Sequence, residues 1–156
     1  MPRKGKTIKR EILPDPKYKS VLLSKFINCV MKRGEKSIAE KIVYGALEII
    51  SEKTKKDGLE IFTEALNNIR PLVKVVSRRV GGSNYQIPTE VTEKAGLAIA
   101  FRWVISVSRN RSEKNMRECL AAELLAAYKK EGTSVKKRED THKMAEANKA
   151  FAHLRW

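Results

Sequence analysis

The sequence is poor in the residue types that most often carry catalysis or bind metals. It has two cysteines and two histidines among its 156 residues. Neither Cys29 and Cys119 nor His142 and His153 fall in a spacing typical of a zinc or iron site. A G-x-x-x-x-G-K-[ST] phosphate loop and a G-x-S-x-G nucleophile elbow are both missing. We therefore expect neither an enzyme nor a cofactor or metal site.

Long hydrophobic runs are missing as well. The longest candidate, residues 95–101, reads AGLAIAF and ends at Arg102, well short of the roughly 18 apolar residues of a membrane-spanning helix. The first ten residues are basic and lack the apolar stretch of a secretory signal. The two cysteines lie among apolar residues, so we expect reduced, partly buried thiols rather than a disulfide or a reactive site. These features favour a cytoplasmic protein.

Acidic residues are too few to balance the basic ones. The chain carries 33 lysines and arginines against 18 aspartates and glutamates, a formal net charge of +15. Residues 1–36 hold 11 basic and 3 acidic side chains and residues 74–117 hold 9 and 3, whereas residues 37–73 hold 5 and 6. Self-repulsion of this size opposes a compact state unless a polyanion neutralises it. The uneven distribution predicts a polyanion-binding face.

Helical periodicity dominates the chain from residue 20 onward. Residues 1–19 lack this periodicity and contain three prolines, so we predict a basic, extended N-terminal tail there. Residues 20–156 are expected to form one helical domain, in which Ser20, Asp57 and Thr133 can each cap a helix. The expected fold is mainly α, a single-domain bundle with about six helices at 20–32, 35–53, 58–70, 92–108, 116 to about 132, and from 133 onward.

One segment, residues 73–91, breaks the helical pattern and reads VKVVSRRVGGSNYQIPTEV. Its apolar residues alternate on either side of Gly81 and Gly82, where a tight turn needs positive φ angles. We predict a protruding two-stranded β-hairpin over about 73–91. Pro88 cannot donate a ladder hydrogen bond, so both strands are expected to be exposed rather than part of a larger sheet. A lone hairpin is marginal in water and needs support at its base or along its length.

The helix expected after the hairpin is apolar on nearly every side between Ala95 and Ile105, and is predicted to be the central helix of the core. Arg102 interrupts it and leaves two interpretations open. Its guanidinium either forms a buried pair with a glutamate or reaches a phosphate beside Trp103. The more polar last helix has four expected apolar anchors, Val135, Met144, Ala145 and Phe151.

Two basic motifs are the main candidates for contact with a polyanion. Arg78 and Arg79 are adjacent in a strand and point to opposite faces, so the hairpin could touch both walls of a groove. Tyr85 and Gln86 add a stacking ring and an amide nearby. The second motif lies at a predicted helix N-terminus, where backbone amides already favour anions. Its basic residues are Arg109, Arg111, Lys114 and Arg117.

Both motifs favour binding to nucleic acid. Composition alone does not separate RNA from DNA, and the alternative is an architectural DNA-binding protein that wraps a duplex with a basic β-arm. The single predicted hairpin and the lack of an obvious dimer interface argue against this alternative, because DNA-bending arms usually work in pairs.

Four stretches carry a resemblance to a known family: ILPDPKY (12–18), RRVGGSNYQIPTEV (78–91), VKKREDTHKMAEANKAFAH (135–153) and the closing LRW. They resemble bacterial small-subunit ribosomal protein seven, and the likeness covers the whole chain in order. The resemblance implies a helical bundle with a protruding β-ribbon that binds the head domain of small-subunit ribosomal RNA and nucleates head assembly. It also implies a position near the exit-site transfer RNA and the messenger RNA path, with small-subunit proteins nine and eleven as partners.

The resemblance and the basic motifs together define the predicted binding residues. Residues 92–96 (TEKAG) depart from the family pattern, which is more basic there, so Glu93 is expected to oppose an RNA contact. The predicted ribosomal RNA surface consists of Arg3, Lys4, Lys9, Arg10, Lys25, Lys32, Arg33, Lys74, Arg78, Arg79, Arg102, Arg109, Arg111, Lys114, Met116 and Arg117. The predicted transfer-RNA and messenger-RNA side consists of Arg79, Gly81, Gly82, Tyr85, Lys143 and Arg155.

Overall fold

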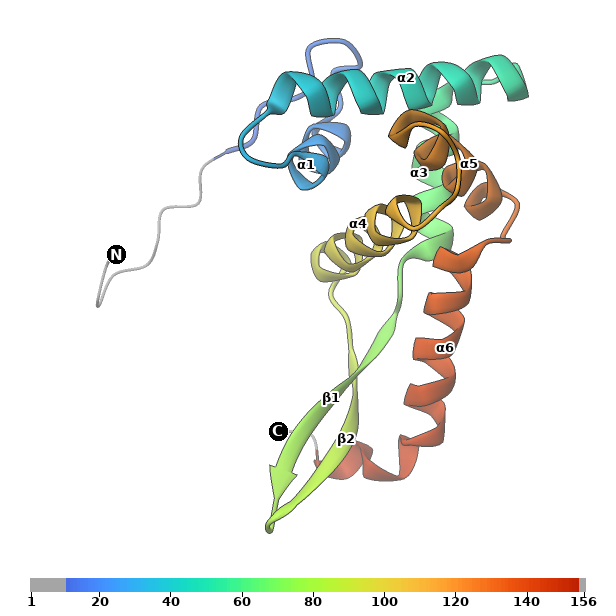
Figure 1. Cartoon of the computed structure of the whole chain (residues 1–156). Helices are drawn as coiled ribbons and strands as arrows, with labels where there is room; N and C mark the ends of the chain where they lie inside the picture. The colour runs from blue at the N-terminus through green and yellow to red at the C-terminus, as the bar shows by residue number, and fades with distance from the viewer. Residues whose placement is uncertain (1–10, 155–156) are drawn as a thin grey trace. The chain divides into compact units, whose positions relative to one another are not determined.

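The computed structural model describes residues 11–154, and Figure 1 draws the chain from blue at the N-terminus to red at the C-terminus. The chain divides into two compact units, Met1–Glu40 and Lys41–Trp156. Within the described residues there are six α-helices, one 3-10 helix and one two-stranded sheet. This confirms the predicted mainly α fold with a single hairpin. Most of the predicted basic tail lies outside the described residues, and its boundary with the helical part stays a prediction.

In the first unit, helix α1 (Val21–Val30) begins where the sequence predicts. Ser20 Oγ accepts a hydrogen bond from the backbone N–H of Leu23 at 3.3 Å, which is the expected N-cap. The helix ends two residues earlier than predicted, because Met31 already has an extended backbone with φ −54° and ψ 134°. Its apolar face is buried at Leu23, Phe26, Ile27 and Val30.

Helix α2 (Lys36–Thr54) begins in the first unit and continues into the second. Helix α3 (Gly58–Ile69) follows it and is capped by Asp57, whose Oδ1 accepts a backbone hydrogen bond from the first turn at 3.0 Å. The helix stops at Arg70, whose ψ of 120° is the extended conformation that a following proline, Pro71, imposes. The predicted cap and the predicted stop of α3 are both confirmed.

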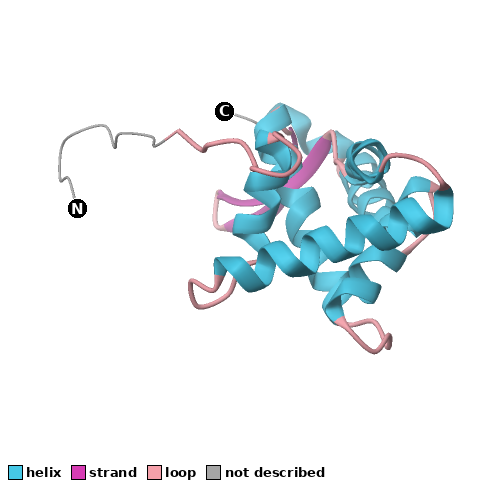
Figure 2. Cartoon of the chain, turned by 90° about the horizontal axis from the view of Figure 1, so that it is seen from above, coloured by secondary structure: helices cyan, strands magenta, loops and turns pink. Residues whose placement is uncertain are grey.

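The core of the second unit forms where α3 packs against α4 (Glu93–Arg109) and α5 (Met116–Tyr128). In Figure 2 these helices are cyan and the two strands are magenta. Burial of each large apolar side chain stabilises the fold by about 1.5–3 kcal/mol. The fully buried side chains of α3 and α5 include Ile61, Phe62, Leu66, Ile69, Leu120 and Leu124.

The prediction that α4 is the central helix, apolar on nearly every side, is wrong. One side of α4 is buried, but a stripe along the opposite side is exposed. Alanine can stand on either side of a helix at little cost, because its side chain is small. An alanine-rich helix therefore looks apolar all round even when one face is open. The exposed stripe consists of Ala95, Ala98, Arg102, Ser106 and Arg109.

Helix α6 (Thr133–Ala147) is capped by a tertiary contact rather than by Thr133. The predicted cap is in fact the first helical residue, and the residue before it makes no side-chain cap. Instead Glu123 of α5, which is fully buried, accepts the N–H of Ser134 at 3.0 Å and pairs with Arg111 Nη1 at 2.8 Å. A carboxylate at this place satisfies a free N–H group and complements the positive end of the helix dipole.

The hairpin pairs β1 (Val73–Val80) with β2 (Ser83–Glu90) in an antiparallel register that leaves Gly81 and Gly82 as a two-residue turn. Their φ angles of 57° and 89° are both positive, as a type I′ turn requires. A Cβ atom at either position would meet nothing within 4 Å. Glycine is therefore needed here for backbone conformation and not for close packing.

The expectation that both strands are exposed holds for only one side of the hairpin. Strand β1 packs against α6, and β2 packs against η1 (Lys149–Leu154), the 3-10 helix that follows α6 (Figure 1). Ile87 is 1% exposed, and the ring of Tyr85 lies 5.3 Å from that of Phe151. The C-terminal segment thus braces the hairpin along its length.

The prediction that Met144 is an apolar anchor of α6 is wrong, because its side chain is 49% exposed.

Two side chains join α6 to the end of α3 and to the linker between α3 and β1, next to the base of the hairpin. His142 Nε2 accepts a hydrogen bond from the backbone N–H of Leu72 at 3.1 Å, and Arg138 Nη1 donates to the carbonyl of Asn68. Because Nε2 is an acceptor, the imidazole is neutral and carries its proton on Nδ1. Burial, and secondly the positive charge of Arg138, lower the pKa of His142 below its usual value.

Replacing the buried carboxylate should weaken the whole second unit. Glu123→Ala is expected to lower the free energy of unfolding by about 2–4 kcal/mol, the sum of a lost helix cap and a lost charged hydrogen bond. Glu64→Ala, at an exposed glutamate in the middle of α3, should change it by less than about 0.5 kcal/mol. Urea unfolding followed by circular dichroism measures both. Equal effects of the two substitutions would contradict the capping role.

Stability should also decline as the pH falls below about 6.5, the usual pKa of histidine. Because the pKa of His142 is lowered in the folded state, the unfolded chain takes up a proton below that pH while the folded chain still excludes it. The urea midpoint should therefore drop between pH 7.5 and pH 5. His142→Gln keeps an acceptor but does not titrate, so its midpoint should drop less. Parallel curves for the two chains would contradict this account.

Candidate nucleic-acid interface

The outer half of the hairpin exposes one polar face. The register places Arg79 opposite Asn84 and Ser77 opposite Gln86, and all four side chains are exposed. Arg78 is half-buried on the other face of the ribbon. The two adjacent arginines therefore point to different sides, as the alternation predicts, but only Arg79 lies on the open side.

Tyr85, the predicted stacking ring, has a partner within the chain. Its half-buried ring packs on Phe151 with an angle of 53° between the ring planes. The exposed part of the hairpin tip is therefore formed by backbone at the two turn glycines and by the polar face that carries Arg79. Two further predicted residues, Lys74 of β1 and Lys143 of α6, are exposed.

Arg102 lies on the exposed stripe of α4. Of the two interpretations that the sequence leaves open, the buried pair with a glutamate is wrong, because the side chain is exposed and pairs with no carboxylate of residues 11–154. Its Nε donates a hydrogen bond to the carbonyl of Ala98, at 3.4 Å. Arg109 lies on the same stripe seven residues on, roughly 10 Å further along the helix axis. Ser106 between them is small, so the stripe offers two guanidinium groups on a smooth surface.

Three exposed basic side chains lie in and beside the loop between α4 and α5: Arg109 at the end of α4, Lys114 in the loop and Arg117 in α5. Arg117 lies in the first turn of α5, and its side chain passes over Gly45 of α2. A Cβ atom built on Gly45 would lie 2.5 Å from Arg117 Cδ, so only glycine leaves room for this arrangement. Met116, the neighbouring predicted residue, is half-buried.

Arg111 of the same loop is held by two carboxylates of the chain. Its Nη2 lies 2.7 Å from Glu113 Oε1, and its Nη1 lies 2.8 Å from Glu123 Oε2. The hydrogen bond to Glu113 raises the pKa of Arg111 and lowers the pKa of Glu113. Most of the hydrogen-bonding capacity of this guanidinium is thus used inside the protein, in contrast to its three neighbours.

The first unit also exposes predicted residues, namely Lys25 on α1 and Lys32 and Arg33 just after it. Arg33 has a φ of 53°, so the chain turns sharply at this basic pair. Five other predicted residues lie outside the described residues and keep the status of predictions: Arg3, Lys4, Lys9, Arg10 and Arg155.

Two glutamates, Glu123 and Glu93, each pair with an arginine of the chain and so offset part of its positive charge. Glu123 was missed by sequence reasoning, although a single glutamate inside the apolar run CLAAELLAA is a signal of a buried ion pair. Glu93, which is expected to oppose RNA at the start of α4, has Oε1 only 2.8 Å from Arg70 Nη1. Its charge is therefore partly offset within the chain.

The described part of the chain was also searched for metal sites, exposed thiols and membrane-spanning helices. Residues 11–154 contain no group of three or more His, Cys, Asp or Glu side chains that could hold a metal ion. Cys119 is buried, which raises its pKa, whereas Cys29 is exposed, contrary to the prediction of partial burial. Among the same residues, no helix is long and apolar enough to cross a membrane. Exposed cations on a helical body with a braced hairpin define a nucleic-acid-binding structural protein.

Comparison with known proteins shows to which family of nucleic-acid-binding proteins the chain belongs. The model of the family described as Ribosomal protein S7p/S5e matches residues 2–149. Relatives named small ribosomal subunit protein uS7 include that of Aliivibrio salmonicida, 60% identical over 156 residues, and that of Thermodesulfovibrio yellowstonii, 58% identical over 156 residues. Each alignment covers 100% of both chains. The chain belongs to the ribosomal protein S7p/S5e family, which confirms the resemblance. It is a structural, RNA-binding protein of the ribosome and not an enzyme.

Removing both hairpin arginines should leave the fold intact. Arg78→Ala combined with Arg79→Ala is expected to preserve the helical circular dichroism and to change the free energy of unfolding by less than about 1 kcal/mol, because neither side chain is in the core. Ile87→Ala, in the same hairpin but buried, should lower it by about 2–4 kcal/mol. Loss of helix in the double variant would refute the view that the tip is independent of the core.

Proposed function

We propose that this chain binds the head domain of small-subunit ribosomal RNA directly and early, and that this binding nucleates assembly of the subunit head. The relatives of 58–60% identity are named as small ribosomal subunit proteins, which supports a place in that subunit. The observation that carries the proposal is the set of exposed cations on α4 and its following loop. None of these cations is paired with a carboxylate of the described chain.

The exposed stripe of α4 is proposed as a track for the RNA backbone. Arg102 and Arg109 stand two helical turns apart on it, and each guanidinium can donate two parallel hydrogen bonds to a phosphate. The small side chains of Ala98 and Ser106 let a sugar-phosphate strand approach the helix closely. Lys114 and Arg117 extend the positive surface beyond the helix end. Most of the affinity would come from release of counterions from the RNA.

Arg111 is assigned a different role from its neighbours. Because Glu113 and Glu123 already hold it, the proposal removes it from the predicted phosphate contacts. It would instead fix the loop that presents Arg109 and Lys114. Such a residue acts on RNA binding through the shape of the loop and not through its own charge.

The hairpin is proposed to contact structured RNA with its open face and tip. Proteins recognise such RNA by shape, phosphates and unstacked bases, and Arg79, Asn84 and Gln86 offer a guanidinium and two amides for these groups. Together with Lys143 and Arg155, this end of the chain would lie near the exit-site transfer RNA and the messenger RNA path. Small-subunit proteins nine and eleven would join after the RNA complex has formed, in the cytoplasm.

A binding titration over a salt series tests the proposal. The ligands are the isolated head-domain ribosomal RNA and a DNA duplex of the same length. A preference for the RNA that persists at high salt is the expected result, because shape recognition adds to counterion release. Equal affinities that vanish together as salt rises would overturn the proposal and favour the architectural DNA-binding alternative.

The same assay tests the track on α4. Arg102→Ala with Arg109→Ala should weaken RNA binding and should reduce the slope of log affinity against log salt by roughly 1.5, since each lost phosphate contact removes about 0.7–0.9. The control is Lys53→Ala with Lys129→Ala, which removes the same charge from exposed positions outside the proposed surface and should keep the slope. Identical slopes for the two double variants would remove α4 from the interface.

A further inference from the structure

A small cleft lies at the base of the hairpin, between the end of α3 and the start of α4. Its volume is about 270 Å³. Three apolar residues, Pro71, Leu72 and Val91, line it together with the charged residues Arg70 and Glu93. Leu72 is 64% exposed, so the cleft presents an apolar surface to solvent. An open apolar surface beside a few polar groups is typical of a binding site.

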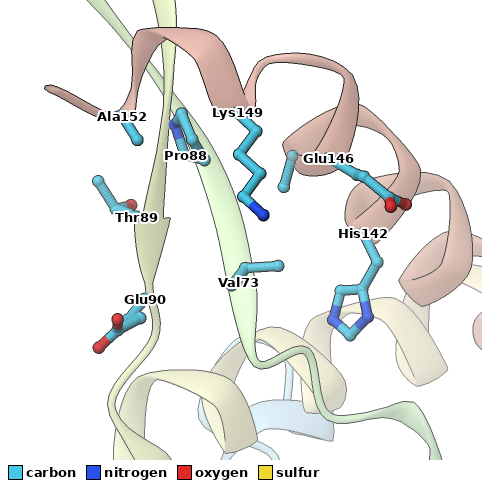
Figure 3. A pocket seen from close by; sticks show the side chains of 9 residues that line it. Val73, Pro88, Thr89, Glu90, His142, Glu146, Lys149 and Ala152 are labelled. Atoms are coloured by element: carbon cyan, nitrogen blue, oxygen red, sulfur yellow. The ribbon is translucent and has the colours of Figure 1, made fainter. Parts of the chain in front are cut away.

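The backbone of Leu72 is fixed from two sides. Its N–H donates to His142 Nε2 at 3.1 Å, and its carbonyl accepts the N–H of Val91 at 2.9 Å. His142 belongs to α6 and also lines, with Val73, the larger groove between the hairpin and the C-terminal segment (Figure 3). The apolar surface of the cleft is therefore formed before any ligand arrives, which lowers the entropic cost of binding.

The charged side of the cleft depends on Gly96. Arg70 Nη1 lies 2.8 Å from Glu93 Oε1, and Gly96 follows Glu93 by three residues on the same face of α4. A Cβ atom on Gly96 would lie 2.9 Å from Arg70 Cγ and 3.2 Å from the carbonyl oxygen of Pro71. Glycine therefore leaves the room in which the side chain of Arg70 runs along α4 to reach Glu93.

This ion pair keeps hydrogen-bonding capacity for a ligand. Within residues 11–154, Glu93 Oε2 and the remaining guanidinium N–H groups of Arg70 have no hydrogen-bond partner. The side chain of Glu93 is 76% exposed and that of Arg70 is 27% exposed, so a ligand can reach both. The two charges cancel, and the cleft thus offers acceptors and donors beside an apolar surface without net charge.

We propose that this cleft binds one unstacked guanine base of the ribosomal RNA. The inference rests on the proposed binding of that RNA. The face of the base would lie against Leu72 and Val91, while its N1–H and N2–H groups would donate to the carboxylate of Glu93. Arg70, which holds this carboxylate, would donate to O6, the acceptor beside N1. Unstacked bases with a free Watson–Crick edge are the usual targets of sequence-specific RNA recognition.

The chemistry of the cleft selects a base over a phosphate. A carboxylate only accepts hydrogen bonds, and a phosphate offers only acceptors and carries the same sign of charge. The expected opposition of Glu93 to RNA thus applies to its phosphates and not to a base edge that carries donors.

The order of donors and acceptors also selects guanine over the other bases. Guanine alone presents two adjacent donors followed by an acceptor on its Watson–Crick edge. Adenine and cytosine present one amino group next to an acceptor, and uracil presents one N–H between two acceptors. Each of these three would set an acceptor against the carboxylate of Glu93, and a site built for donors discriminates strongly against such a mismatch.

Kethoxal footprinting tests the inference, because kethoxal reacts with N1 and N2 of unpaired guanines. The probe is the isolated head-domain ribosomal RNA, alone and saturated with the unaltered chain or with Glu93→Gln. We expect a guanine that the unaltered chain protects and that the variant leaves reactive. The matched control, Glu60→Gln, makes the same change in charge at an exposed position of α3 and should keep the protection. Guanine footprints that are identical for all three chains would overturn the proposal, and a protein segment in the cleft would give this result.

Affinity measurements separate base recognition from charge alone. Glu93→Gln removes a negative charge, so charge alone would tighten RNA binding. The proposal instead predicts binding about tenfold weaker, because the charged acceptor of two hydrogen bonds is lost. Inosine lacks the N2 amino group, so placing it at the protected guanine should weaken binding of the unaltered chain about fivefold and that of the variant less than about twofold. Tighter binding by the variant, or equal losses with inosine, would refute base recognition.

A second variant tests the part played by Gly96. Gly96→Ala keeps both charges but displaces Arg70, so protection of the same guanine should decrease. Circular dichroism verifies the fold of each chain, and Glu93→Gln decides the outcome if Gly96→Ala does not fold. Failure of the unaltered chain to bind the RNA would overturn the proposed function and this inference together. Normal RNA binding without a guanine that depends on Glu93 would overturn the inference alone.

Discussion

The buried carboxylate of Glu123 is the contact on which the arrangement of the second unit depends. It joins α5, the preceding loop through Arg111, and the first turn of α6. A charge buried at such a place without partners would cost several kcal/mol, so these three segments are stable only together. Helix α6 then carries η1, and both support the hairpin. A continuous series of contacts therefore runs from one interior side chain to the ribbon that is proposed to contact RNA.

The arginines of the chain divide into two groups with different roles. Arg70, Arg111 and Arg138 are used inside the protein, where they pair with carboxylates or a backbone carbonyl. Arg102 and Arg109 are exposed on one helix face, without a carboxylate partner in the described chain. The planar guanidinium suits both roles, because it can hold a fixed geometry toward a carboxylate or a phosphate. Net charge alone therefore overstates the number of groups that can reach RNA.

Local sequence signals predicted much of the fold, since caps, glycine turns and prolines act over a few residues. Asp57 before α3 and the Gly81–Gly82 turn are examples, and the family motifs pointed to RNA. The features that sequence reasoning missed are tertiary. Glu123 caps a helix other than its own, and the open face of α4 is hidden by alanines, which fit either environment. The brace from η1 also depends on a contact between residues far apart in the chain, Tyr85 and Phe151.

The close approach of Arg117 to Gly45 has a consequence for genetics. Gly45 has no side chain with which to touch RNA, and it lies on a different helix from every cation of the α4–α5 loop. Yet any larger residue there must displace the Arg117 side chain, whose Cδ leaves no space for even one added carbon. A substitution at position 45 would therefore change the direction of the Arg117 side chain on α5, although the substituted residue itself lies outside the proposed RNA surface.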